Sequence, residues 1–180
     1  MAHKLKIAIW NANGLCQHTQ EINPFLQTFH LDILLVSKTH FTERSHMKIP
    51  NYNIYHTTHP DETAHGGTAV IIRHNIKHHA RAEYKQNNIQ ATSISLNDNK
   101  GKIISRRQQR KNNDLCDLLP PKYNNKHEDY DHFFKTLGNR FLVGGGFNAK
   151  HTFWGSRLTN TKGRELLNVL QYNIQYISTR

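Results

Sequence analysis

The spacing of hydrophobic residues in the first forty positions predicts a strand, a helix and a second strand. Residues 5–10 form an apolar run that stops at a polar loop, residues 11–14. The apolar residues of the next segment recur at the spacing of one helical face: Ile22, Phe25, Leu26 and Phe29. We expect a helix with one buried stripe there. Residues 33–36 are wholly apolar, which is typical of a strand covered on both faces.

The rest of the chain continues this alternation. Gly66-Gly67-Thr68 leads into the apolar residues 69–72, and residues 89–96 alternate between two faces, so both stretches predict sheet strands. Helical spacing returns twice near the end, on either side of a predicted buried strand at residues 141–143: Tyr130, Phe133, Phe134 and Leu137, then Leu166, Leu167 and Leu170. Helices and strands in this order indicate an α/β fold.

Residues 106–119 interrupt the pattern. They begin with a polar, strongly basic run, where a strand begun at residues 102–105 would otherwise continue. We interpret 106–119 as an irregular, exposed basic insertion and Pro120-Pro121 as a turn. No internal repeat and no linker rich in Gly, Ser or Pro divides the chain, so residues 1–180 are expected to form a single domain.

The balance of charges favours polyanionic partners. The 24 Lys and Arg residues exceed the 13 Asp and Glu residues, which gives a formal net charge of +11. Nucleic acid is the commonest reason, although membrane-surface and ribosomal proteins share this balance. No apolar run approaches the ~18 residues of a membrane span, and no apolar signal core follows Met1. We therefore expect an intracellular protein, nuclear or cytoplasmic, without a membrane partner.

Cysteines and histidines give little sign of a metal site. Cys16 and Cys116 form no C-x-x-C motif and are expected to be inert thiols. Three groups of histidines are close in sequence: His56 and His59; His74, His78 and His79; His127 and His132. We identify no carboxylate or cysteine beside them at ligand spacing, so solvated histidines are expected rather than zinc ligands.

Three predicted strands end in polar clusters, at residues 11–14, 37–40 and 144–148. In sheets flanked by helices, ligands gather at strand ends, so these clusters are candidates for one shared pocket. A purely structural interpretation is also open. Asn11 and Asn13 before Gly14 suit a turn, and three consecutive glycines without a phosphate-loop pattern suit a tight turn.

The motifs at these strand ends resemble those of one family. In order they are W-N-A-N-G at residues 10–14, S-x-T-H at 37–40, G-G-x-[FY]-N-A-K-H at 144–151 and W-G-S-R at 154–157. Together they resemble the endonuclease domain of jockey-type non-long-terminal-repeat retrotransposons, which belong to the endonuclease/exonuclease/phosphatase superfamily. The similarity covers almost the whole chain except about 106–119.

The resemblance implies a four-layer α/β sandwich of the deoxyribonuclease I-like type, incomplete at the C-terminus of this chain. It also implies a DNA endonuclease, fused to a reverse transcriptase, that nicks target DNA for target-primed reverse transcription. In the family, Mg²⁺ or Mn²⁺ held mainly by a Glu helps a water attack the phosphodiester. Carried over, Asn11 and Asn148 are catalytic candidates, and Asn13 and His151 are substrate-binding candidates.

Several family positions are changed in this chain. Lys38 occupies the position of the metal-binding Glu, and Gly146 occupies that of a catalytic Asp. The family's Tyr is expected in the interval taken up by the basic insertion, and its late Asp-His pair is expected beyond Arg180. A pair of unit charges at ~4 Å interacts by ~4 kcal/mol at an effective dielectric near 20, so an ammonium in place of a carboxylate strongly opposes a dication. We therefore expect the metal to bind poorly and nicking to be impaired or lost.

Two other interpretations remain at this stage. The +11 charge and the retained asparagines fit a non-catalytic, basic nucleic-acid-binding remnant. The unusual interval 106–119 fits the product of a pseudogene. A phosphatase of the same superfamily is less favoured, because W-G-S-R and T-K-G-R-E point to the retrotransposon branch.

Overall fold

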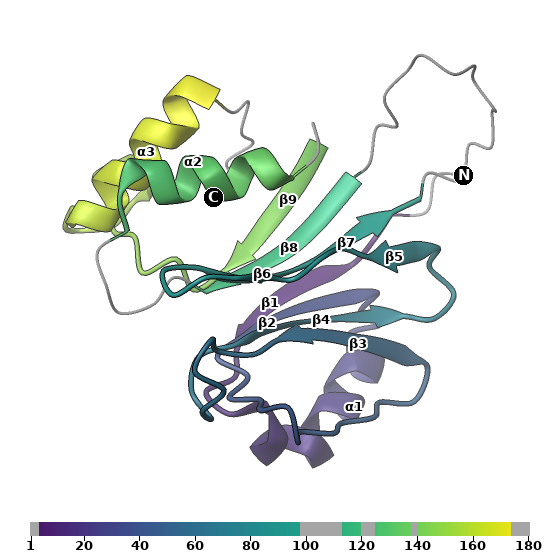
Figure 1. Ribbon diagram of the computed structural model, residues 1–180. Coiled ribbons are helices and arrows are strands. Elements are labelled where there is room, and N and C mark those ends of the chain that lie inside the picture. The colour runs from purple at the N-terminus through teal and green to yellow at the C-terminus, as the bar shows by residue number, and fades with distance from the viewer. Residues whose placement is uncertain (1–3, 98–112, 120–124, 138–139, 174–180) are drawn as a thin grey trace.

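Two β-sheets pack face to face and carry helices on their outer faces, which gives four layers (Figure 1). The computed structural model describes residues 4–97, 113–119, 125–137 and 140–173. The first sheet has the strand order β1 (Ile7–Asn11), β2 (Ile33–Ser37), β4 (Thr68–Arg73), β3 (Tyr52–Thr57). β1 and β2 are parallel, and β4 is antiparallel to both of its neighbours.

The second sheet has the order β5 (His78–Ala80), β7 (Gln90–Leu96), β8 (Asn113–Leu119), β9 (Arg140–Gly145), and β6 (Tyr84–Lys85) also pairs with β7. β7 and β8 are antiparallel, whereas β8 and β9 are parallel. The helices are η1 (Leu15–His18), α1 (Thr19–Thr28), α2 (His127–Thr136), η2 (Thr152–Trp154) and α3 (Thr161–Asn173). α1 covers the first sheet, and α2 and α3 cover the second (Figure 1).

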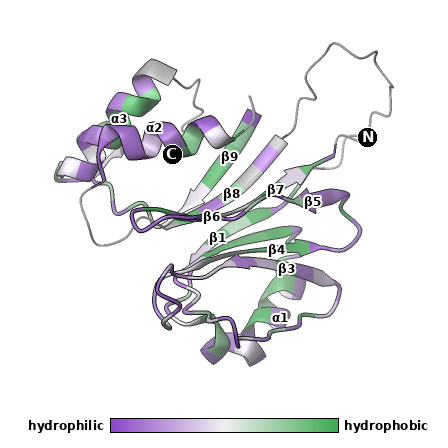
Figure 2. Ribbon diagram, in the orientation of Figure 1, coloured by the Kyte–Doolittle hydropathy of each residue, from purple (hydrophilic) through white to green (hydrophobic). Residues whose placement is uncertain are grey.

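Three hydrophobic clusters lie between the four layers. Leu34 and Val36 of β2 pack with α1, while Ile33 and Leu35 of the same strand pack between the two sheets. This division confirms the prediction that β2 is covered on both faces. The third cluster joins the second sheet to α2 and α3. Figure 2 shows hydrophobic residues concentrated on the central strands.

Two predicted elements form, but with less burial than expected. In α1, Ile22 and Leu26 are buried, whereas Phe25 is 40% exposed, and Phe29, directly after the helix, is 56% exposed. Residues three apart on a helix differ by about 60° in direction, so the two phenylalanines lie beside the face that contacts the sheet. Leu142 of β9 is 48% exposed. β9 is the outermost described strand of its sheet, and it lies over β1, the outermost described strand of the other.

Residues 113–119 are not irregular, which corrects the expectation for the second half of segment 106–119. They form β8, which is hydrogen-bonded to β7 on one side and to β9 on the other. The polar Asp114 is accommodated because its carboxylate accepts hydrogen bonds from Arg81 and Ser95, each at 2.5 Å. The basic run, residues 102–105 and Pro120-Pro121 lie outside the described residues.

Across the described parts of the chain, every helix is too short or too polar to cross a lipid bilayer.

Candidate active site

The ends of β1 and β2 form the centre of the candidate site. The strands are parallel, and Asn11 pairs with Ser37 at their carboxyl ends. The loops that follow are joined by backbone hydrogen bonds. Ala12 N–H donates to Ser37 O at 3.0 Å. Gly14 N–H donates to Lys38 O and Leu15 N–H donates to Thr39 O, each at 2.9 Å. Residues 11–15 and 37–40 are therefore held side by side.

β9 brings the third polar cluster to the same pair of strands. It contacts β1 and β2 across the sandwich, and Figure 1 shows β1 and β9 ending toward the same side of the molecule. A Cβ on Gly144 would lie 2.6 Å from Ile9 Cδ1 and 2.9 Å from Leu35 Cδ1. Glycine lets the strands approach closely here, because a side chain would displace the ends of these two residues.

Asn160, which the sequence analysis did not single out, holds the loop that follows β9. Its Nδ2 donates to Asn148 O at 2.9 Å, and its Oδ1 accepts from Lys150 N at 3.0 Å. The same Oδ1 accepts from Gly163 N at 2.8 Å, so Asn160 also caps the amino end of α3. An Asn directly before a helical sequence is a capping signal, but its second set of contacts depends on the tertiary fold.

Backbone strain is concentrated in these loops. Among the described non-glycine residues with positive φ are Asn13 (49°), Lys38 (54°), His40 (55°) and Asn148 (51°). Such conformations are uncommon outside glycine and gather at functional sites. For Asn13, followed by Gly14 at φ 111°, the turn interpretation also holds.

The sequence of the chain matches the endonuclease/exonuclease/phosphatase family over residues 8–179. The chain belongs to this family. It is 31% identical over 173 residues to the RNA-directed DNA polymerase from mobile element jockey of Drosophila funebris, and it is 31% identical over 168 residues to the Drosophila melanogaster protein. These matches cover 94% and 93% of this chain, but only 18% and 17% of the relatives. They confirm the resemblance to jockey-type elements.

Solved structures confirm the family fold. The endonuclease domain of TRAS1, a telomere-specific non-LTR retrotransposon, superposes with a TM-score of 0.61 at 18% identity, covering 93% of this chain and 70% of that one. An AP endonuclease from Leishmania major gives a TM-score of 0.61 at 8% identity, covering 93% and 66%. The four-layer α/β architecture is thus that of this family.

The family positions lie on the three loops. Asn11, Asn13 and Asn148 are exposed and Lys38 is half-buried. Burial lowers the pKa of the neighbouring His40, and the charges of Lys38 and His65 lower it further, so its imidazole is neutral at pH 7. Unlike Gly145, Gly146 does not adopt a positive φ, so its backbone would accept an aspartate.

His151 lies on the same loop, but one of its nitrogens has a structural partner. Its Nδ1 accepts a hydrogen bond from Phe153 N at 3.0 Å and thereby caps η2. Its ring lies 5.4 Å from that of Trp154, whose Nε1 donates to Ala149 O at 3.1 Å. Both side chains help to shape the loop, and a contact of His151 with substrate remains a prediction.

No family Tyr occurs in β8, the strand that directly precedes Pro120-Pro121. The strand instead carries Asp117, a fully buried carboxyl between Thr92 of β7 and Gly144 of β9. No described residue gives either carboxyl oxygen a hydrogen bond of good geometry. Burial raises its pKa well above the usual range, opposed only in part by the Leu118 N–H. Asp117 was not predicted, because residues 113–119 were expected to be irregular.

The residues present do not fit the family's Mg²⁺ or Mn²⁺. Hard divalent cations take carboxylate oxygens, yet residues 11–15, 37–40 and 145–150 include no Asp or Glu. Asp117 lies beneath these loops, but it is enclosed, and its raised pKa favours the neutral acid. Lys38 adds a positive charge. Family endonucleases are generally dependent on divalent metals, and this set of side chains departs from that requirement.

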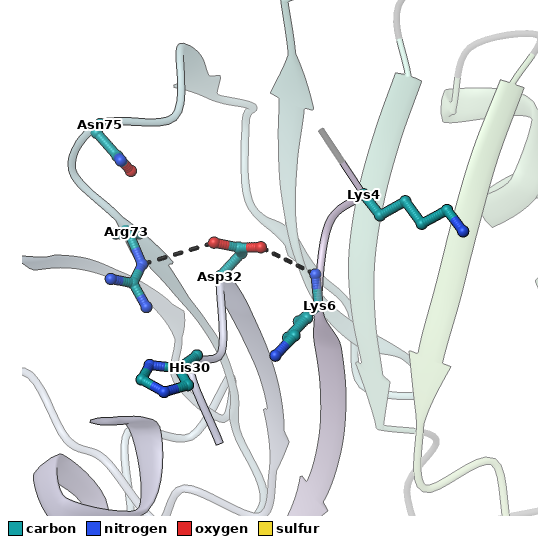
Figure 3. Close-up of a pocket in the computed structure, with 6 residues that line it drawn as sticks. All are labelled: Lys4, Lys6, His30, Asp32, Arg73 and Asn75. Atoms are coloured by element: carbon teal, nitrogen blue, oxygen red, sulfur yellow. Dashed lines mark hydrogen bonds and ion pairs between the residues drawn. The ribbon is translucent and has the colours of Figure 1, made fainter. Parts of the chain in front are cut away.

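A basic pocket lies at the opposite ends of β1 and β2 (Figure 3). It is lined by Lys4, Lys6, His30, Asp32, Arg73 and Asn75. Asp32 lies at its centre, where it accepts a hydrogen bond from Lys6 N at 2.9 Å and lies 3.6 Å from Arg73 Nε. The carboxylate offsets part of the positive charge, and the pocket is remote from the family positions.

Proposed function

We propose that this chain is the endonuclease-type domain of a jockey-like retrotransposon polyprotein, with DNA binding retained and Mg²⁺-dependent nicking impaired or lost. The observation that carries the proposal is the pairing of an intact loop framework with Lys38 and Gly146 at the two acid positions. The curated relatives are RNA-directed DNA polymerases, which supports fusion to a reverse transcriptase and a role inside the cell on DNA.

Retained DNA binding is supported by the chemistry of the loops. The exposed amides of Asn11, Asn13 and Asn148 can donate to phosphate oxygens, and the Lys38 and Lys150 ammonium groups attract them. Lysine serves as a point charge in many phosphate sites. It cannot, however, generate a metal-bound hydroxide. The side chains on these loops are therefore suited to holding a phosphodiester and not to activating a water against it.

Plasmid nicking tests the loss of activity. The chain is incubated with supercoiled plasmid and Mg²⁺, alongside Asn148→Ala and a buffer blank. We expect no conversion to open circles above the blank for either protein, because no carboxylate of the loops holds the ion. Robust nicking by the parent that disappears in Asn148→Ala would contradict the proposal.

Restoring the acids tests its cause. We expect Lys38→Glu combined with Gly146→Asp to bind Mn²⁺ at least about tenfold more tightly than the parent. The ammonium of Lys38 repels the cation and Gly146 is neutral, whereas the two new carboxylates attract it. Titration calorimetry gives the affinity. Lys150→Glu changes the charge of an exposed residue on the same set of loops and is the control. Equal Mn²⁺ affinity in the parent and the double variant would show that Lys38 and Gly146 do not explain the impaired site.

A further inference from the structure

A second group of ionisable side chains lies in the connection between β3 and β4. His59, Asp61 and His65 offer ligand atoms that all lie within 4.8 Å of one another. Solvated histidines were expected, on the premise that no carboxylate lies at ligand spacing. The premise does not hold for His59, since Asp61 follows two residues later and the chain then turns back to bring His65 to the same carboxylate.

Asp61 is the centre of the group. Its Oδ1 lies 2.7 Å from His59 Nδ1, and its Oδ2 lies 3.5 Å from His65 Nε2. The two imidazole rings lie side by side, with centroids 3.9 Å apart. In a tetrahedral site with metal–ligand distances of ~2.0–2.1 Å, neighbouring ligand atoms are roughly 3.3 Å apart. Small side-chain rotations therefore suffice to place the three atoms around one ion.

Thr63 orients two of the three side chains. Its hydroxyl donates to Asp61 Oδ1 at 2.9 Å and contacts His65 Nδ1. One hydroxyl can accept from Nδ1–H while it donates to the carboxylate, an arrangement that leaves the lone pair of His65 Nε2 for a metal. Outer partners of this kind fix the imidazole tautomer in metal sites. An aspartate carboxyl is ionised at neutral pH, so Asp61 offers an anionic oxygen to the ion.

We propose that His59, Asp61 and His65 bind one divalent transition-metal ion of the zinc class. Two imidazoles and one carboxylate are the ligands that Zn²⁺ and Co²⁺ take, whereas Mg²⁺ prefers oxygen alone. The side chains of Asp61 and His65 are 49% and 54% exposed. The ion is thus reachable from solvent, and a water can occupy the fourth coordination position.

The bound ion stiffens a segment next to the candidate active site. The connection ends at Gly66 and Gly67, whose carbonyls accept hydrogen bonds from His40 N at 3.0 Å and Thr39 N at 3.2 Å. These are the residues directly after Lys38. Linking His59, Asp61 and His65 through one ion therefore restricts the motion of residues 59–67, to which the 37–40 loop is hydrogen-bonded.

Metal titration of the full chain tests the proposal. Zn²⁺ affinity is measured by calorimetry, and Co²⁺ binding is followed by its visible absorption, for the parent, His59→Ala, His65→Ala and the control His79→Ala. His79 is an exposed histidine on β5. We expect each of the first two substitutions to weaken Zn²⁺ binding at least tenfold and to abolish the Co²⁺ absorption of the parent, and His79→Ala to change the affinity less than twofold.

Thermal melting supplies a second readout. Zn²⁺ should raise the melting temperature of the parent and leave that of His65→Ala unchanged, because an ion that binds only the folded loop stabilises it. His65 is largely exposed, so its removal should not unfold the chain. Equal Zn²⁺ affinity in the parent and His65→Ala, or an equal loss in His79→Ala, would overturn the site.

Discussion

At the scale of single residues, Asp117 lies in an environment that disfavours a charged carboxylate. The carboxyl lies between the sheets, on the face where Thr92 of the neighbouring strand bonds to the hydroxyls of Thr57 and Thr68. The hydroxyls of those three threonines form hydrogen bonds with one another, whereas the Asp117 carboxyl has no comparable partner among the described residues. Such a carboxyl stays protonated in the folded chain when the unfolded chain has already released its proton.

The consequence for stability follows from the direction of the pKa shift. A raised pKa in the folded state means that the contribution of Asp117 is fully present below the ordinary pKa of aspartate and is lost as the pH rises toward the raised value. We expect Asp117→Asn to increase the free energy of unfolding at pH 7.5, by at most about 1.4 kcal/mol for each pH unit of the shift, and to have little effect near pH 4.

Urea denaturation at the two pH values measures this difference. Glu43→Gln, which neutralises an exposed carboxylate, is the control and should show no such dependence on pH. If Asp117→Asn destabilises the chain equally at both pH values, the carboxyl makes a favourable interaction that the geometry does not indicate.

Motif order was enough to place Asn11, Lys38, Gly146 and Asn148 on loops from strands that pack together. It could not reveal Asn160 or Asp117. The role of Asn160 depends on a loop twelve residues earlier, and the importance of Asp117 depends on which face of β8 it occupies. Both properties are determined by tertiary contacts, which a local sequence pattern does not predict.

At the scale of elements, the amino end of α3 determines the position of the Asn148 loop. Gly163 lies in the first turn of the helix, where a Cβ would lie 1.9 Å from the carbonyl oxygen of Lys150. Helix propensity favours Ala over Gly by about 1 kcal/mol. Here, however, the methyl group would clash with backbone atoms of Lys150, which cannot rotate away as a flexible side chain can. The helix and the loop must move apart when any side chain is present.

We therefore expect Gly163→Ala to lower the free energy of unfolding by about 1–3 kcal/mol, contrary to its helix propensity. Thermal melting measures the effect. Asn168→Ala, at an exposed position of the same helix, is the matched control and should stabilise slightly. A gain in stability for Gly163→Ala would show that the loop does not rest against the helix.

The elements themselves were largely predictable, and their burial was less so. The wholly apolar run of β2 indicated a strand covered on both faces, whereas the four-layer sandwich was implied only by the resemblance to the family. The helical spacing correctly predicted α1, yet Phe25 and Phe29 are exposed. Hydrophobic spacing predicts which side of a helix is apolar, but not how much of that side the sheet covers. β8 was missed because Asp114 and Asp117 obscure its alternation.

At the scale of the whole molecule, the net charge of +11 favours the proposed binding to DNA. Binding that neutralises phosphates releases counterions, so affinity falls as salt rises. We expect affinity for a short duplex to fall more than about tenfold between roughly 50 and 200 mM salt, as for a protein that contacts three or more phosphates. Fluorescence anisotropy measures this. A flat response to salt would contradict backbone binding.

The hydrogen bonds that join residues 11–15, 37–40 and 66–67 run between backbone atoms. Such bonds need only a backbone N–H and a carbonyl, so the side chain at position 38 can change without breaking them. A lysine can therefore stand at the position proposed for the family's Glu while residues 37–40 keep their backbone partners. The shape of these loops and the charge that they present are therefore separable, and a substitution at position 38 can alter the charge alone.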